Sequence, residues 1–437
     1  MLKVLKFGGT SLADASQFKK VAEIVKAEDS RRYVVASAPG KRFSDDIKVT
    51  DLLYECYKTA AKGESIDVVF GKIEDRYKEI IKELGLDLSL DSEFDAIKTA
   101  IQHHAGRDYV ASRGEYLNSM ILAAYLGYDF IDAERGIFFK EDGTFDSEVT
   151  NKVVEGILRN HERAVIPGFY GSMPNGTIKT FSRGGSDITG SIIARAMQAD
   201  IYENWTDVSG MLMADPRIVE NPSVIDTITY KELRELSYMG ATVLHEDAIF
   251  PVHKAGIPIN IKNTNQPEDR GTMIVPHAEP ETSTKIITGV AGRVGLSSFT
   301  IEKDMMNSEL GFGRKILEIF EKHKVSFEHL PSGIDTMSVV VNTDSIKDIK
   351  EEITADIFRV TNADSVTVED GLALVAVVGR GMIKAKGTAM RTFTALTNAD
   401  INIKMIDQGS SELNIIVGVE EEDYIKALKA IYAEFDK

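Results

Sequence analysis

The chain has 437 residues, with 51 Lys or Arg against 68 Asp or Glu, so its formal net charge is −17. This charge disfavours nucleic acid and anionic membranes as partners, because both require a basic patch. The hydrophobic share of 43% is typical of a soluble globular protein, and the length favours about three domains. No apolar run approaches the roughly 18 residues of a membrane helix, so we expect a cytoplasmic protein.

The chain opens with the pattern of a strand, a glycine turn and a helix. Residues 2–7 are largely apolar and meet Gly8-Gly9-Thr10-Ser11, after which the apolar residues keep helical spacing. Ser11, with Asp14 three residues later, predicts a capping box at the start of that helix. The ammonium group of Lys6 lies beside a turn whose backbone N–H groups suit an anion.

Further short β-rich runs alternate with helical patterns through the first part of the chain. They are residues 32–37, 164–168, 201–205 and 258–262. This alternation predicts a mostly parallel sheet covered by helices on both faces, a three-layer αβα sandwich. Ligands of such sheets bind at the carboxyl ends of the strands.

The last third of the chain contains an internal repeat with an offset of 76 residues. Gly311 aligns with Gly387, and the apolar run 339–341 aligns with 415–417. Each copy has the pattern strand, helix, strand, turn, strand, which predicts two βαββ modules of ferredoxin-like type. We place the domains at 1–280 and 285–437, the second containing repeats at about 296–368 and 371–437.

Several strand ends and helix starts carry charged or polar side chains beside glycines. Besides Lys6 they include Arg183 and Asp187 in Ser182-Arg-Gly-Gly-Ser-Asp187, Thr206-Asp207 after a strand, and Glu115 in Ser112-Arg-Gly-Glu115. The last motif predicts a helix start with Glu115 in the first turn, where stabilisation of the helix dipole is the alternative role. Taken together, these groups predict one pocket suited to phosphoryl transfer, in which Lys6 neutralises charge and Asp187 organises the donors.

Other catalytic and metal-binding motifs are absent from the sequence. There is no GxxxxGK[ST], no GxGxxG and no HRD and DFG pair, so a P-loop, dinucleotide or protein-kinase fold is unsupported. The histidines lack zinc-site spacing, and we assign no metal ligands. The single cysteine, Cys56, cannot form an internal disulfide, and we expect a structural thiol.

These motifs together resemble those of the aspartate kinases of the amino-acid-kinase family, and the duplicated tail resembles their tandem ACT modules. The resemblance covers nearly the whole chain. The motifs that carry it are Lys6-Phe-Gly-Gly-Thr-Ser11, Val34-Val-Ala-Ser-Ala38, Thr50-Asp-Leu-Leu53, Ser112-Arg-Gly-Glu115, Arg183-Gly-Gly-Ser-Asp187, Thr206-Asp207, Asp215-Pro216-Arg217 and Lys262-Asn-Thr264.

The resemblance implies transfer of the ATP γ-phosphoryl group, with Mg²⁺, to the β-carboxylate of L-aspartate. The product would be 4-phospho-L-aspartate, at the first step of lysine, threonine and methionine biosynthesis. Lys6 and Asp187 would be catalytic. The aspartate site would contain Ser37, Thr50, Glu115, Arg183 and Ser186. The nucleotide site would contain Lys6, Gly8, Gly9, Thr206, Asp207, Arg217 and Lys262.

The resemblance also implies regulation by an amino acid and dimerisation through the tail, as a homodimer or a dimer of dimers. We expect lysine as the inhibitor, with threonine as the rival effector. The first repeat would bind it through Ser308, Phe312, Gly313, Phe327, Glu328, Ser332 and Asp335. In the second repeat, Lys404 and Ser411 replace the two acidic residues. The alternative is that both repeats act only in dimerisation.

Two other functions remain open at this point. One is phosphorylation of a different acid by another member of the same family, although Glu115 and Arg183 together favour a free α-amino acid. The other is a non-catalytic amino-acid sensor.

The chain also departs from many relatives in the loop after Gly210, where Leu212 replaces a tyrosine that contacts the nucleotide.

Overall fold

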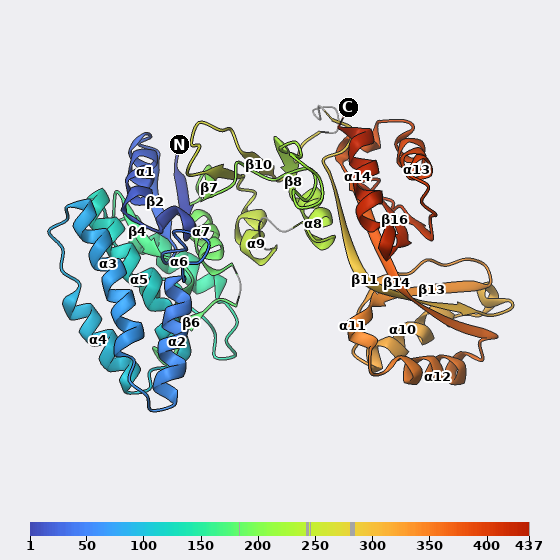
Figure 1. Ribbon diagram of the computed structural model, residues 1–437, viewed down its shortest axis with the longest axis horizontal. Helices are drawn as coiled ribbons and strands as arrows, with labels where there is room; N and C mark the ends of the chain where they lie inside the picture. The colour runs from blue at the N-terminus through green and yellow to red at the C-terminus, as the bar shows by residue number, and fades with distance from the viewer. Residues whose placement is uncertain (183, 242–243, 245, 280–284, 437) are drawn as a thin grey trace. The chain divides into compact units, whose positions relative to one another are not determined.

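The computed structural model forms two compact units (Figure 1). It describes residues 1–182, 184–241, 244, 246–279 and 285–436. The first unit comprises Met1–Met211, Val224–Tyr230 and Thr242–Ala278. The second unit comprises Leu212–Ser223, Lys231–Ala241 and Glu279–Lys437.

The described part of the first unit is built on an eight-stranded sheet with the order β3-β4-β2-β1-β7-β9-β10-β8. From β3 to β9 all neighbours are parallel, whereas β10 runs antiparallel to β9. The strands are β1 (Lys3–Phe7), β2 (Arg31–Ala36), β3 (Asp129–Phe130), β4 (Ala164–Pro167), β7 (Ile201–Thr206), β8 (Thr227–Thr229), β9 (Ile259–Asn263) and β10 (Thr272–Val275). A separate hairpin consists of β5 (Tyr170–Ser172) and β6 (Ile178–Thr180).

Helices cover both faces of this sheet. They are α1 (Ala15–Lys26), α2 (Val49–Ala61), α3 (Asp67–Leu84), α4 (Asp91–Gln102), α5 (Arg107–Leu126), α6 (Ser147–Leu158), α7 (Gly185–Ala196) and α9 (Glu246–Ala255). Helices α2 to α5 pack on one another (Figure 1), and one apolar core joins them and α1 to side chains of β1 and β2. Helix α7 packs on β1, β2 and β7 and contacts α6 and α9. The predicted αβα architecture is confirmed.

The start of α1 differs from the predicted capping box. Residues 10–12 form a short 3₁₀ helix, and Asp14 itself is the N-cap, accepting a hydrogen bond from the backbone N–H of Gln17 at 3.0 Å. The Ser11 hydroxyl is instead buried and hydrogen-bonded to the hydroxyl of Thr264 at 2.8 Å. The prediction was wrong because Ser11 has a tertiary partner in the turn that follows β9, far away in the sequence.

Helix α5 also begins earlier than its motif predicted. It starts at Arg107, so Glu115 lies near its middle and not in its first turn. Stabilisation of the helix dipole, which acts only within the terminal turn, therefore does not explain Glu115. On α2, Cys56 is buried, and burial raises the pKa of its thiol to about 12, which agrees with a structural thiol.

In the second unit, the described residues contain a six-stranded sheet with the order β12-β13-β11-β14-β16-β15. The long strands β11 and β14 run antiparallel along each other (Figure 1). The strands are β11 (Gly289–Glu302), β12 (Phe327–His329), β13 (Thr336–Asn342), β14 (Ser365–Val378), β15 (Met405–Asp407) and β16 (Asn414–Glu420). The helices are α10 (Phe312–Lys322), α11 (Thr343–Ile346), α12 (Lys350–Thr361), α13 (Thr388–Asn398) and α14 (Tyr424–Phe435).

The internal repeat appears directly in these elements. Helices α10 and α13 follow N-cap glycines Gly311 and Gly387, with φ of 80° and 87° in the left-handed region that favours glycine. Both copies have the predicted order strand, helix, strand, strand, and each continues into a further helix, α12 or α14. The predicted pair of βαββ modules is therefore confirmed, with α11 and α12 added to the first module and α14 to the second.

Helix α8 (Tyr230–Tyr238) lies almost entirely in the second unit, although it falls between strands of the first unit in the sequence. Its Glu232 is fully buried and accepts hydrogen bonds from the Thr288 hydroxyl at 2.6 Å and from the backbone N–H of Arg380 at 2.8 Å. The Arg380 guanidinium also pairs with Glu232 at 3.0 Å. A buried ion pair thus holds α8 against the repeats.

We expect Arg380→Ala to reduce the stability of the second unit by about 3–5 kcal/mol, because it leaves the Glu232 carboxylate buried without its guanidinium. Urea unfolding followed by circular dichroism would measure the loss. Arg314→Ala is the control, since Arg314 forms an exposed pair with Glu318 within α10 that contributes little. An equal loss in both variants would contradict the argument.

No helix of the described residues has both the length and the apolar character needed to cross a membrane.

Candidate active site

Lys6 and Asp187 form the centre of the candidate site in the first unit. Lys6 lies near the end of β1 and is 7% exposed, and its Nζ is 2.6 Å from Oδ1 of Asp187 in the first turn of α7. Asn204 of β7 stands beside Lys6 in the sheet and donates a hydrogen bond to the same Asp187 oxygen at 2.9 Å. The carboxylate therefore fixes the position of the ammonium group.

The glycine turn after β1 is adjacent to this pair. The backbone N–H of Gly8 donates to the Trp205 carbonyl at 3.0 Å, and the backbone N–H of Gly40 donates to the Gly9 carbonyl at 2.8 Å. A Cβ on Gly40 would lie 2.6 Å from the carbonyl carbon of Gly9, so only glycine allows the two backbones to approach this closely. The loop after β2 is thereby held against the turn.

Glu115 of α5 lies at the end of β2. Its side chain is 6% exposed, and burial raises the pKa of its carboxyl to about 8, although the nearby Ala38 N–H and the Arg113 charge lower it. A Cβ on Gly114 would lie 2.8 Å from that of Ala38, so the glycine lets α5 approach the strand end. Ser37, directly after β2, is adjacent to this contact.

Ser186 and Thr50 come to the same region from two other elements. Ser186 is in the first turn of α7 and packs on Gly168 after β4, where a Cβ would lie 2.5 Å from the Ser186 hydroxyl oxygen. Thr50 is in the first turn of α2, whose first backbone N–H donates to the Pro39 carbonyl at 3.2 Å. Arg183, the predicted partner of the substrate carboxylate, lies outside the described residues.

The predicted nucleotide residues are not all on one side of the sheet. Thr206 ends β7 and Asp207 follows it, at the same edge as the glycine turn. Lys262 of β9 is level with Trp205, so its side chain leaves the sheet on the face opposite to Lys6. Its Nζ donates to the Asp269 carbonyl at 2.7 Å, and burial lowers its pKa.

Arg217 belongs to the second unit and differs from the other predicted nucleotide residues in its surroundings. It is exposed, and its guanidinium is paired with Asp215 at 2.6 Å. Its assignment to the nucleotide stays a prediction.

Most of the predicted effector residues gather at the start of α10 in the second unit. The backbone N–H of Asn307 donates to the Ile334 carbonyl at 3.1 Å, and that of Met305 donates to the Asp335 carboxylate at 3.0 Å. These bonds hold the loop before β13 beside the short helix that precedes α10. The residues placed in or next to this region are Ser308, Phe312, Gly313, Ser332 and Asp335.

The two predicted effector residues on β12 have different surroundings. Glu328 is paired with Arg293 at 2.8 Å and accepts a hydrogen bond from the hydroxyl of Tyr238 on α8. Phe327 is exposed, on the other face of this edge strand. A cationic effector at Glu328 would therefore have to compete with Arg293, whereas Asp335 is exposed.

The described residues contain no group of three or more His, Cys, Asp or Glu side chains arranged to hold a metal ion. Mg²⁺ in kinase sites is usually bound by one or two carboxylates together with substrate phosphates and water. Asp187 and the exposed Asp207 satisfy that smaller requirement, so the site fits a Mg²⁺ ion that arrives with a nucleotide.

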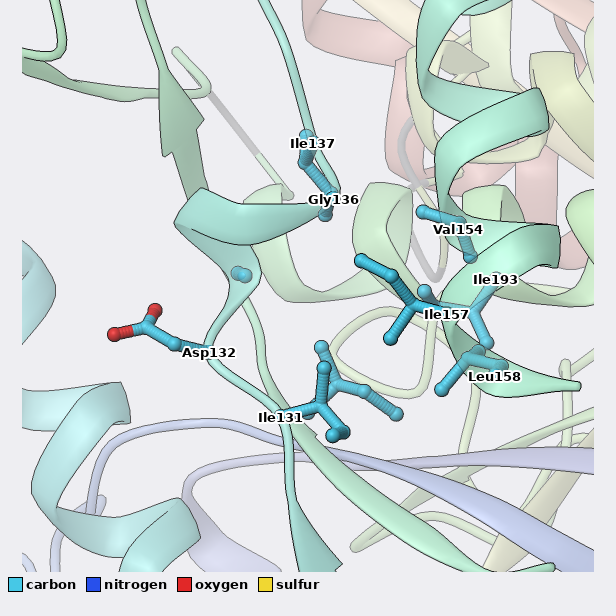
Figure 2. A pocket seen from close by; sticks show the side chains of 10 residues that line it. Ile131, Asp132, Gly136, Ile137, Val154, Ile157, Leu158 and Ile193 are labelled. Carbon is cyan, nitrogen blue, oxygen red and sulfur yellow. The ribbon is translucent and has the colours of Figure 1, made fainter. Parts of the chain in front are cut away.

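A small apolar pocket lies in the first unit, away from the residues described above. Figure 2 shows aliphatic side chains of α6 and α7 facing the segment after β3. Asp132 is the only charged residue among those that line it, and it accepts a hydrogen bond from the Tyr170 hydroxyl at 2.6 Å. None of the predicted site residues lines this pocket, so it is separate from the candidate site.

Two polar residues near the site were not anticipated from the sequence. Asn204 lies within the buried strand β7 and orients Asp187, and Asn118 lies fully buried on α5 and donates to the Ser37 carbonyl at 2.7 Å. An amide side chain inside an otherwise apolar strand is the signal that could have indicated Asn204.

The chain is similar to known proteins over nearly its whole length. The profile of the amino acid kinase family matches residues 1–263, and that of the ACT domain matches residues 375–435. Aspartokinase 3 of Bacillus subtilis is 40% identical, over 99% of this chain and 98% of its own length. The crystal structure of Clostridium acetobutylicum aspartate kinase is 53% identical, with a TM-score of 0.88 and 99% of both chains covered. Escherichia coli aspartokinase III, solved with aspartate and ADP, shares the fold at 24% identity and a TM-score of 0.75.

Proposed function

This chain belongs to the amino-acid kinase family, among its aspartokinases, and from that premise we propose how it transfers the ATP γ-phosphoryl group to the β-carboxylate of L-aspartate. The observation that carries the proposal is the buried pair of Lys6 and Asp187 beside the glycine turn at the carboxyl edge of the sheet. The product is 4-phospho-L-aspartate, and ADP leaves.

The reaction requires little covalent chemistry from the protein. The acceptor carboxylate is already ionised at neutral pH, so no general base is needed. One of its oxygens attacks the γ-phosphorus, and the bond from that phosphorus to the bridging oxygen of ADP breaks. Lys6, oriented by Asp187, neutralises the negative charge that spreads over the transferred group, and the backbone N–H groups around Gly8 and Gly9 bind phosphate oxygens.

Opposite charges select the acceptor. Glu115 pairs with the α-ammonium group of aspartate, Arg183 with its α-carboxylate, and Ser37, Thr50 and Ser186 line the same side of the site. Asp187 and Asp207 would hold a Mg²⁺ ion that arrives with the nucleotide, and the ion would supply neutralisation of the phosphate charge.

Residues 285–437, with their two ACT repeats, act as the regulatory region, and residues 1–280 form the catalytic domain, of which 212–223 and 231–241 pack in the second unit. Lysine binds at the start of α10, where backbone N–H groups at the helix N-terminus suit its carboxylate and Asp335 suits its side-chain ammonium group. The repeats also join two copies of the chain. Inhibition requires that lysine bind two states of the protein unequally.

Trapping of the acyl phosphate with hydroxylamine tests both the transfer of the phosphoryl group to aspartate and the inhibition by lysine. With ATP, Mg²⁺ and aspartate we expect the coloured hydroxamate, and we expect millimolar lysine to reduce its rate more than threonine does. Asp335→Asn should keep the basal rate and weaken the inhibition. If no hydroxamate forms with aspartate but another acid yields one, the acceptor is wrong; if lysine has no effect, the effector is wrong.

A further inference from the structure

The peptide group between Ser37 and Ala38 lies beside one face of helix α5. The Ser37 carbonyl accepts the hydrogen bond from Nδ2 of Asn118 at 2.7 Å, and the Ala38 N–H faces the Glu115 carboxyl. Glu115 and Asn118 are three residues apart on α5, so they share one face of the helix. The orientation of the Asn118 amide follows, because its NH₂ group must face the carbonyl.

This arrangement leaves two acceptor atoms on that face with no hydrogen-bond partner among the described residues. They are Oε2 of Glu115 and Oδ1 of Asn118, and both are buried. The two side chains are 6% and 0% exposed. A buried acceptor without a donor is costly. The amide oxygen of Asn118 can only accept, and the Glu115 oxygen accepts once its carboxyl is ionised, so a cationic group with several N–H donors would satisfy both atoms. The side-chain amide of Asn118 cannot flip to give its oxygen a donor, because the flipped amide would place that oxygen against the Ser37 carbonyl.

Ser119, the next residue on α5, is also fully buried with an unpartnered Oγ. Its hydroxyl differs in kind, because in another χ1 rotamer a serine within a helix can donate to a backbone carbonyl one turn earlier. The Asn118 Oδ1 atom has no such alternative. The donor is therefore expected at Glu115 and Asn118 and not at Ser119.

We propose that Asn118 is a specificity residue of the acceptor site and binds the α-ammonium group of the amino-acid substrate together with Glu115. This inference rests on the proposed function and assigns one more ligand to the same site. An ammonium group has three N–H donors, and a single carboxylate oxygen satisfies only one of them. Glu115 supplies the opposite charge, and Asn118 supplies a second, neutral acceptor whose direction is set by the Ser37 carbonyl.

The test uses the full-length protein with Asn118→Leu, which removes both polar atoms at nearly constant size. We expect KM for aspartate to rise about tenfold, as for loss of a hydrogen bond to a charged group, with kcat changed less than twofold. Succinate, which lacks the ammonium group, serves as a competitive inhibitor, and its inhibition constant should be the same in wild type and variant. Ser119→Ala is the matched control and should leave both constants unchanged.

Asn118→Asp separates binding of the substrate from positioning of Ser37, because it keeps an acceptor oxygen but loses the donor to the Ser37 carbonyl. We expect this variant to bind aspartate better than Asn118→Leu does. The inference is overturned if Asn118→Leu keeps KM within twofold, if the constants for aspartate and succinate rise together, or if Ser119→Ala has the same effect. If wild type forms no hydroxamate with aspartate, the proposed function itself fails.

Discussion

Replacing Lys6 with methionine is expected to lower kcat by about 10²–10³-fold, the range seen when one preorganised donor to a transition state is removed. Lys6 is a buried cation beside the glycine turn, and its Nζ would lie 3.5 Å from a Cβ on Gly8. Methionine has nearly the same length but no charge, so the transferred phosphoryl group loses its neutralising partner. Initial rates of hydroxamate formation at saturating ATP and aspartate measure the effect.

Lys19→Met is the control for this prediction, because Lys19 is exposed on α1 of the same unit and should keep full activity. The Lys6→Met protein should still fold, since the Asp187 side chain is 21% exposed to water and keeps the hydrogen bond from Asn204. Circular dichroism and the melting temperature check this point. A folded variant with more than a tenth of the wild-type kcat would contradict the role of Lys6.

Replacing Glu115 with glutamine is expected to raise KM for aspartate by about 10- to 100-fold, the cost of losing a charge-assisted hydrogen bond. The pH dependence is a second signature. Burial raises the Glu115 pKa to about 8, so below that pH the carboxyl of the free protein is mostly neutral. Because the substrate ammonium group binds the charged form, kcat/KM for aspartate in wild type should rise with pH up to about 8. The same profile in the glutamine variant should be flat.

The effect of Glu115→Gln on stability should be opposite to its effect on binding. The Glu115 pKa is higher in the folded protein than its ordinary value of 4.5, so the unfolded chain releases this proton first as pH rises. Wild type therefore loses stability from pH 4.5 to about 8, whereas glutamine, which stays neutral, does not. The variant should melt several degrees higher at pH 9 and show no advantage near pH 4.

Thermal melts of both proteins across this pH range, without substrate, check the prediction. Glu83→Gln is the control, because Glu83 is exposed near the end of α3 and should change neither the melt nor KM. A gain in stability that is the same at pH 4 and pH 9 would show that packing, and not charge, is responsible. An unchanged KM would remove Glu115 from the acceptor site.

Two of the places where prediction and structure differ have a common cause. Ser11 has the sequence pattern of a cap, but it hydrogen-bonds Thr264, which is distant in the sequence. Likewise α8 falls between strands of the first unit in sequence order, yet it packs in the second unit through the Glu232–Arg380 pair. In both cases a tertiary partner prevailed over a local preference, and such partners leave no mark on the spacing of neighbouring residues.

By itself, the sequence determined the features that depend on short-range pattern: the strand ends with their glycines and charges, the parallel αβα sheet, and the repeat with its offset of 76 residues. These follow from periodicity and backbone geometry, which act over a few residues. Only the tertiary structure decided which groups are paired and how deeply they are buried. It brought Asp187 to Lys6, left Glu115 and Asn118 with unpartnered oxygens, and placed Lys262 on the opposite face, because hydrogen bonding and desolvation depend on neighbours far apart in the chain.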